Sequence, residues 1–248
     1  MPPPRQQQRA ALPQGALERI RNNLERCQRA IAGASQRVGR DPKEVLLLAV
    51  TKYVGCDAVR VLLDLGVRDF GESTIQGIAT KVEELGKHEG LRWHLTGHLQ
   101  RNKVARACEL CHAIHSVDSV RLLEELSAVS RRRSLQVPEL YVELNLTGET
   151  RKTGLAESDL AGLLEWIRAD EGLAARTKGL MAMAAYSSDP EASRPTFRRL
   201  RELRDSLRNR GLLSGAGLSM GMSGDFEVAV EEGATVVRVG SMLFENLA

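Results

Sequence analysis

The chain has 248 residues, of which 42% are hydrophobic, and this is enough for one large domain with a full core. Its 35 basic and 32 acidic residues give a net charge of +3, which is too balanced to favour a nucleic-acid partner. No run of eighteen apolar residues occurs, which argues against a membrane-spanning helix, and four cysteines in a chain this long are typical of reduced thiols.

The N-terminal segment, MPPPRQQQRAALPQG, is rich in Pro and Gln and lacks the apolar stretch of a signal peptide. We therefore expect a disordered tail over residues 1–14, a cytoplasmic protein, and a single domain over residues 15–248. A transit peptide is the alternative, because the first seventeen residues hold two Arg and no acid. An amphipathic helix is predicted next from apolar residues spaced three and four apart, namely Leu17, Ile20, Leu24, Cys27 and Ile31.

From residue 45 onward, apolar runs alternate with helix-favouring stretches. The first run, VLLLAV, is continuous, as a strand buried on both faces requires. The predicted strands are 45–50, 67–70, 92–95, 113–117, 140–145, 178–183, 217–221 and 236–239. The predicted helices between them are 57–65, 74–86, 99–108, 119–132, 157–168, 191–209 and 224–232. This alternation predicts an α/β fold, a single (β/α)₈ TIM-type barrel with an extra N-terminal helix, rather than an open doubly wound sheet.

The chemistry of such a barrel lies at the carboxyl ends of its strands. The first strand ends in Thr51-Lys52, and a lysine at the mouth of an apolar strand is expected to be partly desolvated. Desolvation lowers the pKa of an amine and favours Schiff-base formation. The alternative is a lysine that extends its charged end into solvent from a strand terminus.

Two turns have the composition of a phosphate site. The segment LSMGMSGD, which ends at Asp225, follows the seventh strand, and Gly240-Ser241 follows the eighth. Loops after these two strands commonly bind phosphate in this fold, because free backbone N–H groups and a helix N-terminus attract anions. The alternative is two ordinary turns in which Ser223 or Asp225 caps a helix.

Together these segments resemble the pyridoxal phosphate homeostasis protein family, also called the YggS/PROSC family. The resemblance covers nearly the whole chain from about residue 16. It lies in AVTK, in FGES with Gln76, in WHLTGHLQRNK and in LSMGMSGDFEVAVEEGATVVRVGS. Several long motifs in the right order are far more specific than any one of them. Two positions depart from the pattern, since Ser73 stands where the family has Asn and Gly77 where it has Glu.

The resemblance implies a barrel like the N-terminal domain of alanine racemase, of PLP fold type III, that binds pyridoxal 5′-phosphate (PLP). Lys52 falls on the family's Schiff-base lysine, and Arg238 is implied to face the pyridine nitrogen. The resemblance places five residues around the phosphate: Ser219, Met220, Ser223, Gly240 and Ser241. Three more residues are expected to contact the cofactor: His94, Gly97 and Asn145.

The implied function is PLP homeostasis, with the protein as a carrier or buffer that affects amino-acid and keto-acid balance and has no established catalytic reaction. The expected partners are PLP and PLP-requiring apo-enzymes, with no nucleic acid or membrane, and the expected state is a monomer or weak homodimer. A charged Arg beside the ring nitrogen opposes its protonation and weakens the ring as an electron sink, which agrees with a carrier.

The main alternative function is an amino-acid racemase of the alanine racemase type. Such an enzyme needs a second acid–base group, which alanine racemases take from a tyrosine in a further C-terminal domain. None of the tyrosines here, Tyr53, Tyr141 and Tyr186, lies in a matching motif, and the chain ends just after the eighth strand.

Metal and haem sites are further alternatives. The run from Cys108 to His112 has the spacing of a c-type haem attachment site, and His94 and His98 are four residues apart. The strand context of both segments favours structural roles instead. The Arg-rich stretch 194–210 is expected to be an outer helix with a solvated face rather than a nucleic-acid surface.

Overall fold

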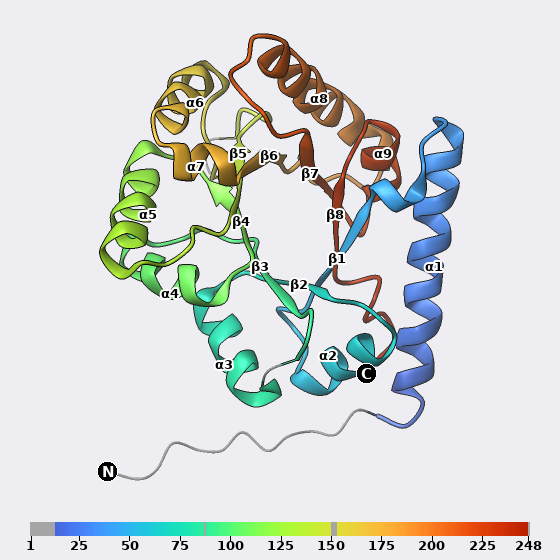
Figure 1. Cartoon of the computed structure of the whole chain (residues 1–248). Coiled ribbons are helices and arrows are strands. Elements are labelled where there is room, and N and C mark those ends of the chain that lie inside the picture. Colours follow the sequence, from blue (N-terminus) through green and yellow to red (C-terminus); the bar gives the residue numbers. More distant parts are fainter. Residues whose placement is uncertain (1–12, 87, 150–152, 248) are drawn as a thin grey trace, which may run out of the picture.

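The computed structural model describes residues 13–86, 88–149 and 153–247, so only Pro13 and Gln14 of the predicted tail are described. Within these ranges, parallel strands pair in sequence order and the last pairs with the first, which closes a barrel (Figure 1). They are β1 (Leu46–Val50), β2 (Asp69–Glu72), β3 (Arg92–Leu95), β4 (Ala113–Val117), β5 (Glu139–Leu144), β6 (Thr177–Ala182), β7 (Gly217–Met222) and β8 (Val236–Val239). The predicted TIM-type barrel is therefore confirmed.

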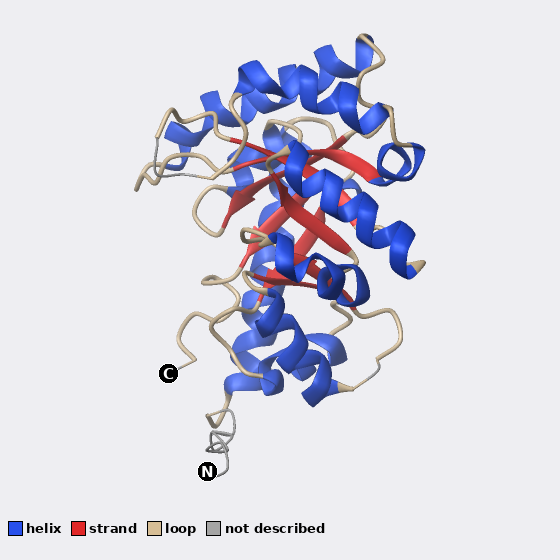
Figure 2. Ribbon diagram, turned by 90° about the vertical axis from the view of Figure 1, so that its left-hand side faces the viewer, coloured by secondary structure: helices blue, strands red, loops and turns tan. Residues whose placement is uncertain are grey.

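Helices surround the strands, as the turned view shows (Figure 2). They are α1 (Ala16–Arg37), α2 (Cys56–Asp64), α3 (Ile75–Leu85), α4 (Val104–Leu110), α5 (Val120–Arg133), α6 (Leu160–Arg168), α7 (Glu171–Arg176), α8 (Arg194–Asn209) and α9 (Phe226–Glu231). Several predictions need correction, and the strand predicted at 67–70 is β2 at Asp69–Glu72. The helix predicted at 99–108 begins only at Val104, after a short 3₁₀ turn, and α7 was not predicted.

The N-terminal helix α1 completes the outer ring. It lies between α9 and α2, beside the segment that follows β8 (Figure 1). Asn23 Nδ2 donates to the carbonyl oxygens of Leu243 and Glu245, both at 3.2 Å. Arg40 donates to the carbonyl oxygens of Val230 and Ala234 at the end of α9, at 2.7 and 3.0 Å. Helix α1 thus covers the strands where the helix after β8 lies in a regular barrel.

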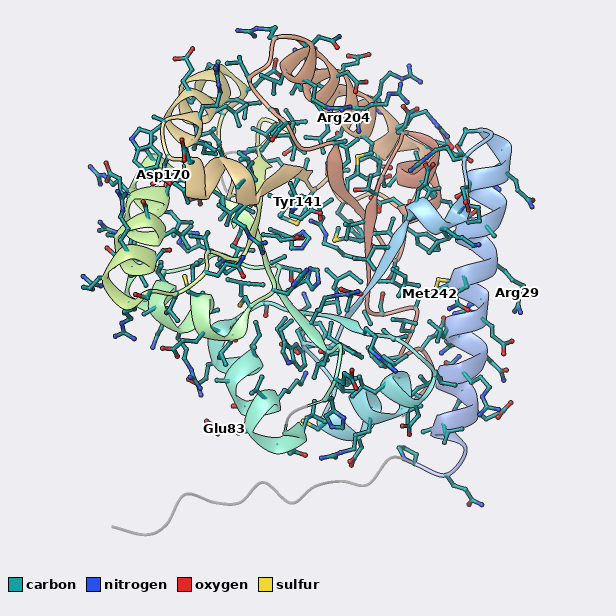
Figure 3. The ribbon with its side chains drawn as sticks, viewed as in Figure 1. Arg29, Glu83, Tyr141, Asp170, Arg204 and Met242 are labelled. Atoms are coloured by element: carbon teal, nitrogen blue, oxygen red, sulfur yellow. The ribbon has the colours of Figure 1, made fainter. Side chains whose placement is uncertain are left out.

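The strands have two differently filled faces. Side chains on the outer face pack against the helices and form the main apolar core. Inside the barrel a smaller apolar cluster contains Leu48, Tyr141, Met181 and Val236. Tyr141 lies near the middle of the ring of strands (Figure 3). The strands also carry buried polar and charged residues, among them Asp69, His94, His115 and Arg238.

The outer helices carry paired charges. The Arg-rich stretch forms the outer helix α8, whose inner side buries Phe197, Leu200 and Leu207. Its arginines face acids of α9, for example Arg194 with Glu231 at 2.6 Å. None of the helices in the described ranges is long and apolar enough to cross a membrane.

Candidate functional site

Lys52 lies at the mouth of the barrel, just beyond β1. The chain turns there, with the Val54 N–H donating to the Thr51 carbonyl oxygen at 3.0 Å. This turn leaves Thr51 buried but carries the Lys52 side chain into solvent, where Nζ lies 4.8 Å from the centre of the Tyr53 ring. The expected partial desolvation of Lys52 is therefore wrong. Its amine is accessible to a ligand that approaches the mouth.

A buried ion pair supports the backbone next to Lys52. The Lys81 ammonium, on α3, donates to the Thr51 carbonyl oxygen at 2.6 Å and to Glu72 at the end of β2. The Thr51 hydroxyl also donates to Glu72 Oε1, at 2.8 Å. A Cβ on residue 77 would lie 2.9 Å from Glu72 Oε2, so Gly77 leaves room for this carboxylate. Neither partner was singled out from the sequence, because the pair joins a strand end to the far part of a helix.

The turns after β7 and β8 meet on one hydroxyl oxygen. Ser223 Oγ accepts from the backbone N–H groups of Gly240 and Met242, at 3.2 and 3.4 Å. The Met222 N–H donates to Asp225 Oδ1 at 2.6 Å, and burial raises the pKa of Asp225. Two amides that converge on one oxygen form a cradle that an oxygen of a phosphate group can occupy. The structure thus brings the two predicted phosphate turns together.

The residues beside this cradle are accessible to solvent. Ser241 and Gly224 are exposed, and a Cβ on Gly224 would meet no atom within 4 Å. Gly240 is more constrained, since a Cβ there would come within 3.0 Å of the Val50 carbonyl oxygen of β1. A glycine at 240 therefore lets the end of β8 lie against the end of β1, close to Lys52.

Arg238 is a buried cation inside the barrel. It lies on β8, and its guanidinium donates to the Ala182 carbonyl oxygen at 3.2 Å and to Ser219 Oγ at 3.5 Å. Among the described residues, no carboxylate forms an ion pair with it. Burial lowers the pKa of Arg238 to about 10, and the more distant Glu143 and Asp225 offset this only in part. The group is still charged at neutral pH and can donate to a further acceptor.

Three predicted cofactor contacts lie away from the phosphate turns. His94 is buried inside the barrel, where its ring nitrogens face Asp69 Oδ1 at 3.0 Å and His115 Nε2 at 2.9 Å. Ser219 Oγ is also buried and lies 2.8 Å from His115 Nδ1. Met220 belongs to the core between strands and helices. All three residues lie on strands β3 and β7, before the turns that follow those strands.

Asn145 and Gly97 hold loops in place. Asn145 Oδ1 accepts from the N–H and the hydroxyl of Thr147, at 3.3 and 3.1 Å, within the loop after β5. A Cβ on Gly97 would lie only 2.3 Å from the Ser73 carbonyl oxygen. The loop after β2 therefore packs directly on the end of β3, which requires glycine there. In this arrangement both residues shape the mouth.

Glu143 is a buried carboxyl at the end of β5 that the sequence did not single out. The Thr153 hydroxyl donates to its Oε1 at 2.7 Å. Burial raises the pKa of Glu143, and the nearby Asp118 raises it further, while Arg238 and His98 oppose the shift. The only sequence signal was a charged residue inside an otherwise apolar strand.

The metal and haem alternatives gain no support. Burial raises the pKa of Cys108 to about 11 and of Cys111 to about 12, so both thiols are protonated at neutral pH rather than in the thiolate form that binds metals. His98 is exposed and lies 3.3 Å from Asp118, so it does not share a site with the interior His94. Across the described part of the chain, no three His, Cys, Asp or Glu side chains form a group that could hold a metal ion.

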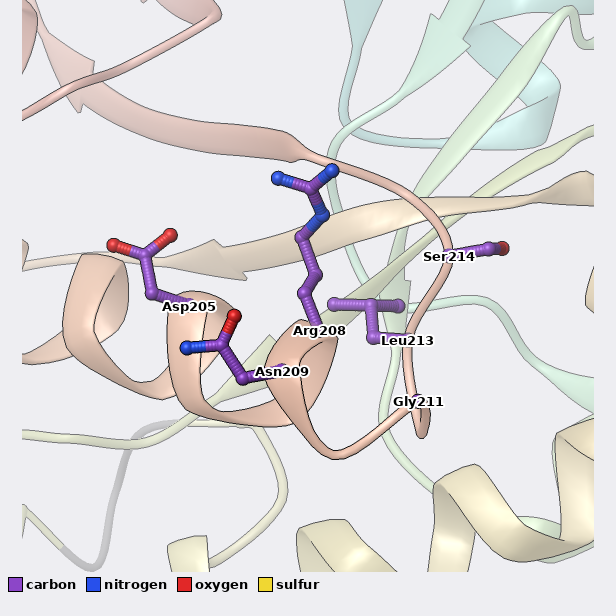
Figure 4. A pocket seen from close by; sticks show the side chains of 6 residues that line it. All are labelled: Asp205, Arg208, Asn209, Gly211, Leu213 and Ser214. Atoms are coloured by element: carbon purple, nitrogen blue, oxygen red, sulfur yellow. The ribbon is translucent and has the colours of Figure 1, made fainter.

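A hollow of about 720 Å³ lies at the other end of the barrel, between the end of α8 and the loop that enters β7 (Figure 4). Its lining residues are Asp205, Arg208, Asn209, Gly211, Leu213 and Ser214. It precedes β7, whereas Lys52 and the two turns follow their strands. The hollow contains none of the groups described above, so the chemistry is assigned to the mouth.

Comparison with known proteins points to one family. Residues 16–246 match the family model of the alanine racemase N-terminal domain. The chain is 38% identical over 229 residues to the pyridoxal phosphate homeostasis protein of Aquifex aeolicus, covering 92% of this chain and 97% of that one. It is 40% identical over 230 residues to the protein of that name from Pseudomonas aeruginosa, covering 92% and 96%. PipY of Synechococcus elongatus, solved with PLP bound, has a TM-score of 0.77 and 33% identity and covers 86% of this chain and 99% of its own.

Proposed function

The chain belongs to the pyridoxal phosphate homeostasis proteins, and on that premise we propose that it binds PLP at the mouth of its barrel. The protein holds PLP reversibly and delivers it to PLP-requiring apo-enzymes. In this way it buffers the free cofactor and influences amino-acid and keto-acid balance.

The observation that carries this proposal is the arrangement of three groups on neighbouring strands. Arg238 of β8 pairs in register with Leu48 of β1, four residues before Lys52. Two residues after Arg238, Gly240 meets Ser223 of the turn after β7. An amine, a buried guanidinium and an oxygen cradle thus lie at the ends of β1, β8 and β7. PLP has a group for each of them: an aldehyde, a pyridine nitrogen and a phosphate.

Each residue has a defined task. The exposed Lys52 amine forms the Schiff base. The N–H groups of Gly240 and Met242, with the hydroxyls of Ser223 and Ser241, hold the phosphate oxygens. Arg238 donates to the pyridine nitrogen, and this gives the buried guanidinium an acceptor beyond the Ala182 carbonyl and Ser219. When bound, PLP supplies an electron-withdrawing ring, but a cation beside its nitrogen opposes ring protonation and weakens that capacity. This electrostatic arrangement favours holding the cofactor over transforming amino acids.

A first experiment tests the covalent site. Wild-type protein mixed with PLP should develop the absorbance of a PLP Schiff base, and borohydride should fix the cofactor on Lys52. Lys52→Ala should abolish both signals, whereas Lys103→Ala, at another exposed lysine, should leave them unchanged. Stoichiometric fixation on a different single residue of the Lys52→Ala protein would overturn the assignment.

A second experiment tests the phosphate site and the carrier role. Pyridoxal, which lacks the phosphate, should bind at least about tenfold more weakly than PLP, since charge-assisted hydrogen bonds contribute about 1.5–3 kcal/mol each. Equal affinities for pyridoxal and PLP would show that the Ser223 and Gly240 turns are not the phosphate-binding site. The holo-protein should transfer PLP to an apo-enzyme without exchanging the α-protons of amino acids in D₂O. Exchange and racemisation at about 1 s⁻¹ or faster would identify a racemase instead.

A further inference from the structure

An unbroken chain of polar contacts runs through the barrel interior to Arg238. Asp69 Oδ1 lies 3.0 Å from His94 Nε2, and His94 Nδ1 lies 2.9 Å from His115 Nε2. His115 Nδ1 lies 2.8 Å from Ser219 Oγ, which accepts from Arg238 at 3.5 Å. All five residues are buried, and they come from five different strands: β2, β3, β4, β7 and β8.

The ion pair between Asp69 and Arg92, at the end opposite Arg238, fixes the direction of these hydrogen bonds. The Arg92 guanidinium donates to both oxygens of Asp69 and already balances its charge. Burial raises the pKa of Asp69, but the hydrogen bonds from Arg92 and His94 outweigh this and lower it to about 2. In the arrangement that we infer, His94 carries a single ring proton, because Arg92 already donates to both oxygens of Asp69. Its Nε2 faces the carboxylate and therefore carries the hydrogen.

The remaining donors follow from this tautomer. With Nε2 of His94 protonated, its Nδ1 is an acceptor, so His115 must donate from Nε2. His115 Nδ1 is then an acceptor and takes the hydroxyl proton of Ser219, which leaves the Ser219 oxygen free to accept from Arg238. Burial lowers the pKa of His115 well below its ordinary value, which agrees with a neutral ring. The ring is further held by stacking on Tyr141, at 4.5 Å between centres and an angle of 6°.

In this series of hydrogen bonds, each residue therefore donates to the next residue toward Asp69. Each of them accepts on the side that faces Arg238. Aligned hydrogen bonds polarise one another, so the chain brings part of the Asp69 charge toward a guanidinium that has no paired carboxylate within the described residues. The anchored Nη1 also fixes the rotamer of Arg238. This leaves the guanidinium oriented for one more acceptor.

We propose that Asp69, His94, His115 and Ser219 are positioning residues, which hold Arg238 in the orientation that meets the pyridine nitrogen. This inference rests on the proposed function. It extends the ligand site to the interior of the barrel, because residues as far away as Asp69 then influence how tightly the cofactor ring is held.

The first test needs no cofactor. Long-range ¹H–¹⁵N NMR of the apo-protein distinguishes imidazole tautomers, and both His94 and His115 should be neutral and protonated on Nε2. Asp69→Asn should disturb the His115 signals although the two residues do not touch. A cationic His94, or His115 protonated on Nδ1, would overturn the inference.

The second test is a double-mutant cycle on PLP affinity. His115→Phe, which keeps the stacking ring, and the smaller change Ser219→Ala should each weaken PLP binding by about tenfold, the typical effect of a hydrogen bond to a charged group. In an Arg238→Gln background both changes should have less than about a twofold effect, because they act through Arg238. His88→Phe is the control, since His88 is exposed in the loop before β3, and it should leave the affinity unchanged.

The outcomes separate the two proposals. Failure of the wild-type protein to bind PLP would overturn the proposed function and this inference with it. Binding by the wild type, with losses from His115→Phe or Ser219→Ala that persist in the Arg238→Gln background, would overturn the positioning role alone. The NMR test decides the direction of the chain even if His115→Phe does not fold.

Discussion

Replacing Lys81 by Met should destabilise the barrel by about 3 kcal/mol. The Lys81 and Glu72 side chains are only 10% and 5% exposed, so the substitution would leave a carboxylate buried without its partner. Removing one member of a buried ion pair costs about 3–5 kcal/mol. We expect the lower end of this range, because the Thr51 hydroxyl would still donate to Glu72 and because Met fills much of the volume of the lysine stem. The Thr51 carbonyl oxygen would lose the Lys81 ammonium as a donor and keep the Val54 N–H.

Thermal unfolding followed by circular dichroism measures this effect. For a chain of this size, about 1 kcal/mol shifts the Tm by about 2–4 °C, so Lys81→Met should lower the Tm by about 6–12 °C. Lys103→Met, at an exposed lysine, should leave the Tm unchanged. The double variant Glu72→Gln/Lys81→Met should recover most of the loss, since it leaves no unpaired charge. A Tm for Lys81→Met within about 2 °C of wild type would refute the reasoning.

Three further predictions follow from the site. Burial lowers the pKa of His115 below 6.5, so the unfolded chain takes up this proton first and the free energy of unfolding should fall as the pH drops below that value. Urea unfolding should show a slope of up to about 1.4 kcal/mol per pH unit from this group, shallower in His115→Phe; equal slopes in the two proteins would contradict it. Gly97→Ala should cost about 1–3 kcal/mol in urea unfolding, because its Cβ would meet the Ser73 carbonyl oxygen at 2.3 Å, whereas Gly162→Ala, with open space around it, should cost nothing. Similar stability in both alanine variants would exclude the close approach at Gly97. Arg238→Glu should raise the pKa of the bound pyridine nitrogen, since an opposite charge favours the protonated form. An identical ¹⁵N shift of the ring nitrogen in wild type and variant would place Arg238 elsewhere.

The fold could be predicted because strand and helix signals are local. The strands at 92–95, 113–117 and 236–239 match the structure to the residue. The second strand was placed at 67–70, whereas β2 is Asp69–Glu72. The error has a physical reason. Apolarity identified Val67 and Phe70, but β2 contains two buried acids whose partners, Arg92 and Lys81, are distant in sequence.

In the candidate site, too, local features could be predicted from the sequence and features that depend on the folded barrel could not. The turns at Ser223 and Gly240 could be predicted, because glycines and hydroxyls after a strand are a local pattern with a known preference for anions. The exposure of Lys52 could not, since it depends on how the turn after Thr51 leaves the barrel. The hydrogen-bonded series inside the barrel could not be predicted either. Its members are spread from Asp69 to Arg238, and only the closed barrel brings them into contact.

The exposure of Lys52 and the burial of Arg238 have opposite consequences for the cofactor. A buried, oriented guanidinium loses little conformational freedom when it donates to a ring nitrogen, so it favours tight and specific binding. If the proposed Schiff base forms on Lys52, its exposed position would give water access to the bond that must be hydrolysed to release PLP. A catalytic lysine is usually desolvated so that its amine stays reactive and water is excluded. In the proposed complex, tight contacts at the phosphate and ring nitrogen are combined with a solvent-exposed Schiff base. This combination suits a protein that must both retain PLP and release it.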